Sequence, residues 1–272
     1  MVSAKEVVVI GVNRIELKGR LYAYRDIGQG RPTLWLHAFP LWGASFTPQM
    51  EALADVCRLI VPDHRGFGGS EMGPGPSTME LLADDALTLL DKLGIERAVV
   101  AGVSMGGYTA MALTRIDPSR VAGLLLIDTQ MSADDEAGKQ KREETARAIE
   151  AKGPVHLVET LLPKLLSSSA PAALKTRVAE WIQSASVEAL TGAVRGMALR
   201  SDSRDILARF HGPTCVVVGA NDTITPPEKA QAMADLLVGS QLEIVPNAAH
   251  LTQLEAPEAF NAIAQNFIKR TG

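Results

Sequence analysis

The sequence has few cysteines, no long apolar run and no excess of one charge, and each shortage excludes a class of protein. Cysteine occurs twice, at Cys57 and Cys215, which is too few for a disulfide framework. Both lie beside apolar runs, which predicts buried thiols in a reducing compartment, the cytoplasm. No apolar stretch approaches the ~20 residues that span a bilayer. The Val/Ile run within residues 1–12 is too short for a signal-peptide core and is typical of a first strand.

The charge balance excludes partners that require a strong field. The chain has 27 Lys and Arg against 31 Asp and Glu, a net charge of -4. This gives no reason to expect binding to nucleic acid or to an anionic membrane. A hydrophobic fraction of 46% over 272 residues indicates a folded chain of one large domain or two small ones. No cluster of His, Cys and Asp has metal-ligand spacing, so we expect neither a metal nor an organic cofactor. We expect a monomer or a homodimer.

Short apolar runs alternate with longer stretches of helical periodicity, which predicts a parallel sheet covered on both faces. The predicted strands are Leu21–Asp26, Thr33–Leu36, Leu59–Pro62, Ala98–Val103, Leu124–Asp128, Cys215–Gly219 and Leu242–Val245. The predicted helices between them are Thr47–Asp55, Met79–Leu93, Met105–Ile116, Glu228–Leu237 and Pro257–Lys269. Since no helix separates the first two strands, we expect an antiparallel edge.

This alternation stops between about Met131 and Phe210. Four helical segments replace it, at Asp134–Ala151, Val155–Leu166, Ala172–Ser184 and Glu188–Leu199. Ser132 and Asp135 have the spacing of a capping box. Because both flanks return directly to the sheet, we predict a helical lid at 131–210 on a core formed by 1–130 and 211–272. An independent bundle is the alternative.

The motif Gly102-Val103-Ser104-Met105-Gly106 lies between a predicted strand and a predicted helix. A serine on such a sharp turn has its hydroxyl exposed at the carboxyl edge of the sheet, and the glycines permit the close approach of strand and helix. This pattern predicts that Ser104 is a nucleophile. The N-terminus of the following helix favours negative charge developing beside it.

A serine nucleophile needs a base, and the base needs an orienting acid. Of five histidines, only His250 follows the last predicted strand, in the chain order that this turn requires. Asp222 and Asp128 both end predicted strands and compete for the acid role. We favour Asp222, because it lies in a turn between strand and helix.

Hydrolysis of a carbonyl compound also needs an oxyanion hole of two backbone N–H groups. We expect one from Met105 and one from Phe39, in the loop His37-Ala38-Phe39-Pro40. His37 is expected to bond backbone groups of this loop. The candidate residues of a substrate pocket are His37, Trp42, Leu162 and Trp181.

Several motifs, in order, resemble those of lidded α/β-hydrolase fold enzymes over nearly the whole chain. They are HAFP, with Ala38 where glycine is usual, Asp63–Ser70, GVSMGG, GANDTITPP and NAAHLTQLEAPEAF. The resemblance implies an α/β fold with an eight-stranded, mostly parallel sheet, helices on both faces and a helical lid inserted after strand 6.

The residues at the turn narrow the reactions that the resemblance allows. Related dehalogenases and epoxide hydrolases use Asp where this chain has Ser104, and carbon–carbon bond hydrolases often have Asn where it has Val103. We therefore predict a carboxylic ester hydrolase that acts on a small-molecule ester or lactone through an acyl-enzyme. The alternatives are a lactonase similar to 3-oxoadipate enol-lactonases, a carbon–carbon bond hydrolase, and a small-molecule receptor without turnover. A lactonase for acidic substrates would need a cation, for which Arg65, Lys164, Arg195 and Arg200 are candidates.

Overall fold

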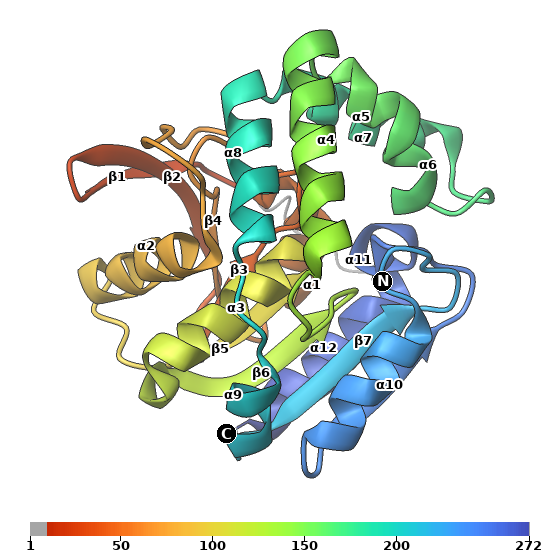
Figure 1. Cartoon of the computed structure of the whole chain (residues 1–272). Helices are drawn as coiled ribbons and strands as arrows, with labels where there is room; N and C mark the ends of the chain where they lie inside the picture. The colour runs from red at the N-terminus through yellow and green to blue at the C-terminus, as the bar shows by residue number, and fades with distance from the viewer. Residues whose placement is uncertain (1–9, 272) are drawn as a thin grey trace, which may run out of the picture.

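The fold is built on one mixed sheet, which a computed structural model describes for residues 10–271 (Figure 1). Eight strands lie in the order β1-β2-β4-β3-β5-β6-β7-β8. Their bounds are β1 Asn13–Leu17, β2 Arg20–Ile27, β3 Pro32–Leu36, β4 Arg58–Pro62, β5 Ala98–Val103, β6 Val121–Ile127, β7 Thr214–Gly219 and β8 Gln241–Val245. β1 pairs antiparallel with β2 and β2 with β4, whereas the other pairs are parallel. The predicted antiparallel edge is confirmed.

Helices cover both faces of the sheet. One face packs α2 (Met79–Lys92), α3 (Met105–Ile116), α9 (Arg204–Arg209) and α10 (Pro227–Leu236), and the other packs α1 (Thr47–Leu53) and α12 (Pro257–Arg270). The helix α11 (Thr252–Glu255) and the 3-10 turns η1 (Gly43–Phe46) and η2 (Pro118–Arg120) complete this part. None of the helices in residues 10–271 has both the length and the apolar character needed to cross a membrane.

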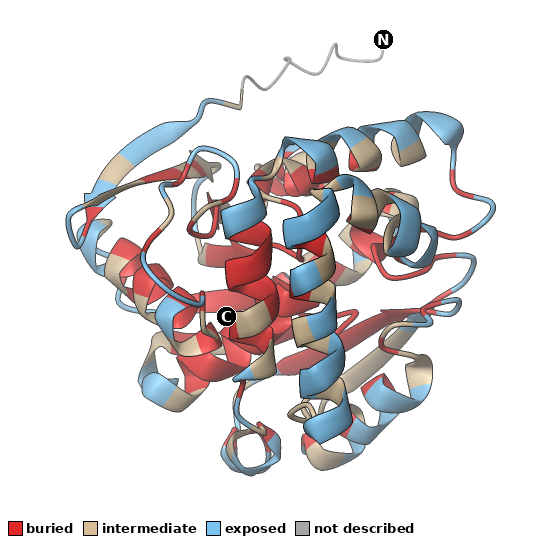
Figure 2. Cartoon of the chain, turned by 45° about the horizontal axis from the view of Figure 1, so that its top comes forward, coloured by how far each residue is buried: buried red, intermediate tan, exposed pale blue. Residues whose placement is uncertain are grey.

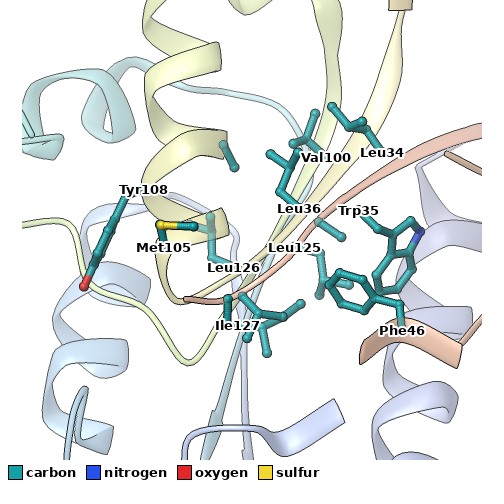
Figure 3. Packing of buried hydrophobic residues seen from close by; sticks show 14 of the residues in the cluster. Leu34, Trp35, Leu36, Phe46, Val100, Met105, Tyr108, Leu125, Leu126 and Ile127 are labelled. Carbon is teal, nitrogen blue, oxygen red and sulfur yellow. The ribbon is translucent and has the colours of Figure 1, made fainter. Parts of the chain in front are cut away.

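The inner strands are buried on both sides, as their continuous apolar sequence predicts. Every residue of β5 is buried, and Trp35 of β3 is fully enclosed. Trp35 meets Phe46 edge-to-face at a centroid distance of 5.4 Å, while Met105 and Tyr108 of α3 lie on the opposite side (Figure 3). Buried residues fill the centre of the molecule and exposed ones its outer surface (Figure 2). The close packing of these buried side chains holds the inner strands, and therefore their carboxyl ends, in place.

A helical insertion separates β6 from β7. It contains α4 (Glu136–Lys152), α5 (Val155–Thr160), α6 (Leu162–Leu165), α7 (Ala172–Ser184) and α8 (Val187–Ala198), which gather together above the sheet in Figure 1. The amide of Ser203 donates to the carbonyl of Met131 at 2.9 Å and so joins the two ends of the insertion. We refer to residues 131–203 as the insertion, because α9, which follows, packs with α3 and α10 on the sheet.

The structure corrects some sequence predictions. The predicted helix Val155–Leu166 is two helices, α5 and α6, because the chain turns at Leu161 ahead of Pro163. The N-cap of α4 is Asp135, whose side chain accepts from Gly138 N, so Ser132 does not cap it. β1 was not predicted, because its side chains are mostly exposed and polar. The strand predicted in 1–12 falls mainly on 1–9, outside the described residues, and 10–12 are not strand.

Candidate active site

Ser104 lies on a sharp turn between β5 and α3. Its φ of 52° and ψ of -112° are costly for a residue with a side chain. Two hydrogen bonds hold it there: its N–H donates to the carbonyl of Ile127, and the hydroxyl of Thr129 donates to its carbonyl, both at 2.9 Å. The strained backbone is therefore fixed by the neighbouring strand β6.

The glycines of this turn are required by close backbone contacts. A Cβ on Gly102 would lie 2.3 Å from the carbonyl oxygen of Gly106, and a Cβ on Gly106 would lie 2.0 Å from that of Leu36. Both distances are too short for any side chain. This is the close approach of strand and helix that the motif predicts.

The structure brings Ser104, His250 and Asp222 into one chain of hydrogen bonds. The Oγ of Ser104 is 2.8 Å from Nε2 of His250, and Nδ1 of His250 is 2.7 Å from Oδ2 of Asp222. Since Nδ1 faces a carboxylate, it carries the ring proton, which leaves Nε2 to accept the serine hydroxyl. All three are buried, although Ser104 is separated from His250 by 146 residues.

Asp222 is held as a carboxylate by its surroundings. Burial alone would raise its pKa, but hydrogen bonds from His250 and Thr225 lower the pKa below its usual value. Thr225 donates its hydroxyl to Oδ2 at 2.7 Å, and the N–H groups of Ile224 and Thr225 donate to Oδ1 at 2.8 and 3.0 Å. Sequence analysis did not identify Thr225. The available signal was that an Asp in a turn commonly binds the backbone two residues on, here Ile224, which brings the neighbouring Thr225 within reach.

Asp128, the competing acid, binds other groups. Its Oδ1 accepts from Gly219 N and from the Thr252 hydroxyl, both at 2.9 Å, and its Oδ2 accepts from Thr252 N at 3.0 Å. It thus ties the end of β7 to the segment that follows His250. Complete burial raises the pKa of Asp128 to about 7.

Two backbone N–H groups expected to form an oxyanion hole lie at the carboxyl edge of the sheet, where Ser104 also lies. Phe39 follows β3 and Met105 begins α3, at the carboxyl ends of neighbouring parallel strands. Among the described residues, neither N–H has a hydrogen-bond partner. Two unpaired N–H groups at this edge are available to a ligand oxygen.

The other candidate residues have distinct surroundings. His37 is fully buried; its Nδ1 meets the carbonyl of Ala38 at 3.0 Å and its Nε2 accepts from His64 N at 2.9 Å. Trp42 and Trp181 are half-buried and meet at a centroid distance of 5.8 Å, which links the core to the insertion. Leu162 is half-buried at the start of α6.

Three of the four candidate cations are already paired with carboxylates. Arg65 binds Asp85 of α2, and both side chains are buried. Arg195 binds Glu143 and Glu150, and Arg200 binds Asp134. Lys164 lies in α6 and is exposed. No group of three or more His, Cys, Asp or Glu residues within the described range is placed to hold a metal ion.

Comparison with known proteins assigns the chain to a family. The family model for the alpha/beta hydrolase fold matches residues 32–257, which is most of the sequence. The chain belongs to the alpha/beta hydrolase fold family. It is 30% identical over 225 residues to 3-oxoadipate enol-lactonase 1 of Acinetobacter baylyi, covering 82% of each sequence.

The fold of the chain is similar to the solved structures of two enzymes. A thermophilic esterase from Thermogutta terrifontis superposes with a TM-score of 0.92 at 37% identity, covering 96% of this chain and 99% of that one. The enol-lactonase from Burkholderia xenovorans LB400 superposes with a TM-score of 0.87 at 23% identity, covering 94% and 100%. The predicted family and the α/β fold with its eight-stranded, mostly parallel sheet are confirmed, whereas the role of the insertion as a lid stays a prediction.

Proposed function

We propose that this α/β-hydrolase is a serine hydrolase that cleaves small carboxylic esters through an acyl-enzyme. The observation that carries the proposal is the continuous chain from Ser104 Oγ through the His250 ring to Asp222. An imidazole whose Nδ1 proton is held by a carboxylate presents the lone pair of Nε2 to the hydroxyl, which is the arrangement a general base needs.

In the proposed mechanism each of these groups has its own role. His250 takes the proton of Ser104 as Oγ attacks the ester carbonyl, and Asp222 stabilises the imidazolium that forms. The unpaired N–H groups of Phe39 and Met105 bind the oxyanion. His250 then protonates the leaving alcohol, and the same base activates the water that releases the acid from Ser104.

Replacing the nucleophile tests the assignment. We expect Ser104→Ala to reduce kcat for p-nitrophenyl acetate by at least 10³-fold and to abolish labelling by a fluorophosphonate. The matched control is Ser119→Ala, which removes an exposed hydroxyl beyond α3 and should leave both unchanged. An S104A variant that keeps its turnover while folded would contradict the proposal.

Lactone hydrolysis is the second candidate, because a relative that is 30% identical bears the name 3-oxoadipate enol-lactonase 1. The same acyl-enzyme chemistry opens a lactone ring. Against an acidic lactone, Arg65, Arg195 and Arg200 are already engaged by carboxylates. A panel of neutral esters, neutral lactones and acidic lactones separates these substrates, and fluorophosphonate labelling without turnover of any would indicate a receptor.

A further inference from the structure

Glu255 connects the insertion to the segment that carries His250. It is the last residue of α11, five residues after the histidine. Its Oε1 accepts from the N–H and the hydroxyl of Ser167 at 2.8 and 2.6 Å, and its Oε2 accepts from the N–H of Ala249 at 2.6 Å. One carboxylate thus binds both its own segment, at Ala249, and a loop that lies 88 residues earlier in the chain, at Ser167.

These hydrogen bonds hold the backbone at Ser167 and at Ala249. Ser167 lies in the loop between α6 and α7 and is 8% exposed, while Ala249 is 3% exposed. Hydrogen bonds to a carboxylate are short and stronger than neutral ones. The bond from Ala249 fixes the peptide plane between Ala248 and Ala249, one residue before His250. The orientation of the imidazole and the position of the insertion loop therefore depend on the same side chain.

The two halves of the insertion are attached differently. The α8 half is packed closely on the core, since a Cβ on Gly196 would lie 1.9 Å from the carbonyl oxygen of Ser77, and Ser77 N donates to Gly192 O at 3.0 Å. In residues 155–184, by contrast, the bonds from Ser167 to Glu255 are the only hydrogen bonds to the core among the described residues. Figure 1 shows α6 above α11, on the side of the insertion away from α8.

We propose that Glu255 is a positioning residue that couples the seating of the α5–α7 segment on the core to the placement of His250. If Ser167 moves away, Oε1 loses two donors and exchanges them for water, and the carboxylate is no longer held on both sides. The bond to Ala249 then loosens, and His250 departs from its 2.8 Å contact with Ser104. When this segment is seated over a bound substrate, Glu255 is held on both sides and His250 is placed to accept the proton of Ser104. The kinetic form of this proposal rests on the proposed ester hydrolysis.

The decisive variant is in the insertion, at a residue with no hydrogen bond to Ser104, His250 or Asp222. Ser167→Ala removes one donor to Glu255 and none to the triad, and should lower kcat for p-nitrophenyl acetate about 3- to 10-fold, with KM changed less than about twofold, because small displacements of a base are costly. Ser167→Thr keeps the hydroxyl and should restore the rate. Glu255→Gln, with one carbonyl oxygen for two segments, should lower kcat about 10- to 100-fold.

Two controls separate coupling from a general loss of charge or stability. Glu258→Gln removes an exposed carboxylate three residues away and should behave as the unaltered protein. In the Glu255→Gln background, Ser167→Ala should lower kcat by a smaller factor than in the unaltered protein, because its influence passes through residue 255. Additive losses in the double variant would contradict the coupling.

Amide hydrogen exchange gives a readout that does not depend on turnover. Ser167→Ala and Glu255→Gln should both speed exchange in peptides covering 166–170 and 247–251, whereas Glu258→Gln should change neither. Faster exchange at 166–170 alone, with 247–251 and kcat unchanged, would overturn the proposal. Turnover that does not depend on Ser104 would overturn the proposed function instead, while the exchange experiment would still test the coupling.

Discussion

The two aspartates beside His250 differ in what they bind, so their replacements should have different effects. Asp222 accepts the Nδ1 proton of His250, whereas Asp128 accepts from Gly219 and Thr252. We expect Asp222→Asn to lower kcat about 10²- to 10⁴-fold, because it removes the charge that stabilises the imidazolium. Asp128→Asn should lower kcat less than about 10-fold and cost about 1–3 kcal/mol of stability through its lost acceptor.

Steady-state kinetics and urea unfolding of both variants check this pair. Equal losses of kcat in the two variants would show that Asp128 shares the acid role. At this scale the sequence indicated Ser104 and His250, because each follows a strand that ends at the same edge. It favoured Asp222 over Asp128 because Asp222 lies in a turn between strand and helix. It did not indicate Glu255, because its partner Ser167 belongs to a loop whose position depends on how the insertion packs.

At the scale of elements, the seating of α8 depends on two glycines that differ in what surrounds them. A Cβ on Gly196 would meet the backbone carbonyl of Ser77 at 1.9 Å, but a Cβ on Gly192 would meet the flexible end of Met72 at 2.6 Å. We therefore expect Gly196→Ala to lower the free energy of unfolding by about 1–3 kcal/mol, because backbone must shift. Gly192→Ala should cost less than about 1 kcal/mol, since the Met72 side chain can rotate away.

Chemical denaturation of the two alanine variants tests this comparison, and limited proteolysis of the insertion shows where each variant loosens. Similar losses in both would mean that the contact with Ser77 does not control the seating of α8. The same contact explains a limit of the sequence. The helix Val187–Ala198 was predicted almost to its ends from periodicity, but its docking surface on the loop at Ser77 was not, since no local pattern marks a close approach of distant segments.

Over the whole molecule, the sequence predicted the strand–helix alternation well because buried strands carry continuous apolar runs. Ala98–Val103 and Met105–Ile116 have the predicted ends. Prediction was poor at the exposed edge, where β1 has the pattern NRIEL and no apolar run. It was also incomplete for α9 and α11, which are short and are fixed by tertiary contacts. Local sequence therefore determines the centre of this fold more than its periphery.

The pH dependence of stability depends on three buried groups with opposing effects. Burial lowers the pKa of His37 to about 4 from 6.5, so between these values the unfolded chain binds more protons and acidification destabilises the fold. Burial raises the pKa of Asp128 to about 7 from 3.8, so in that window the folded chain binds more protons and acidification stabilises it. Each shift corresponds to on the order of 3–4 kcal/mol, and the two nearly offset each other.

Because the effects of His37 and Asp128 nearly cancel, His64 determines whether acidification stabilises or destabilises the fold. Its ring centroid lies 4.3 Å from that of His37, with the two rings tilted by 49°. Its Nε2 has no partner among the described residues, and burial lowers its pKa well below 6.5. Lowering the pH from 7 to 5 should then reduce the free energy of unfolding and lower Tm, because the unfolded chain binds the protons that buried His64 excludes. His64→Phe keeps the ring contact without a titrating nitrogen and should make Tm nearly constant over this range. The control, His211→Gln, removes an exposed imidazole and should keep the full drop, as measured by thermal unfolding at each pH. If the H64F protein still loses stability on acidification as steeply as the unaltered chain, the buried histidine pair does not control the response.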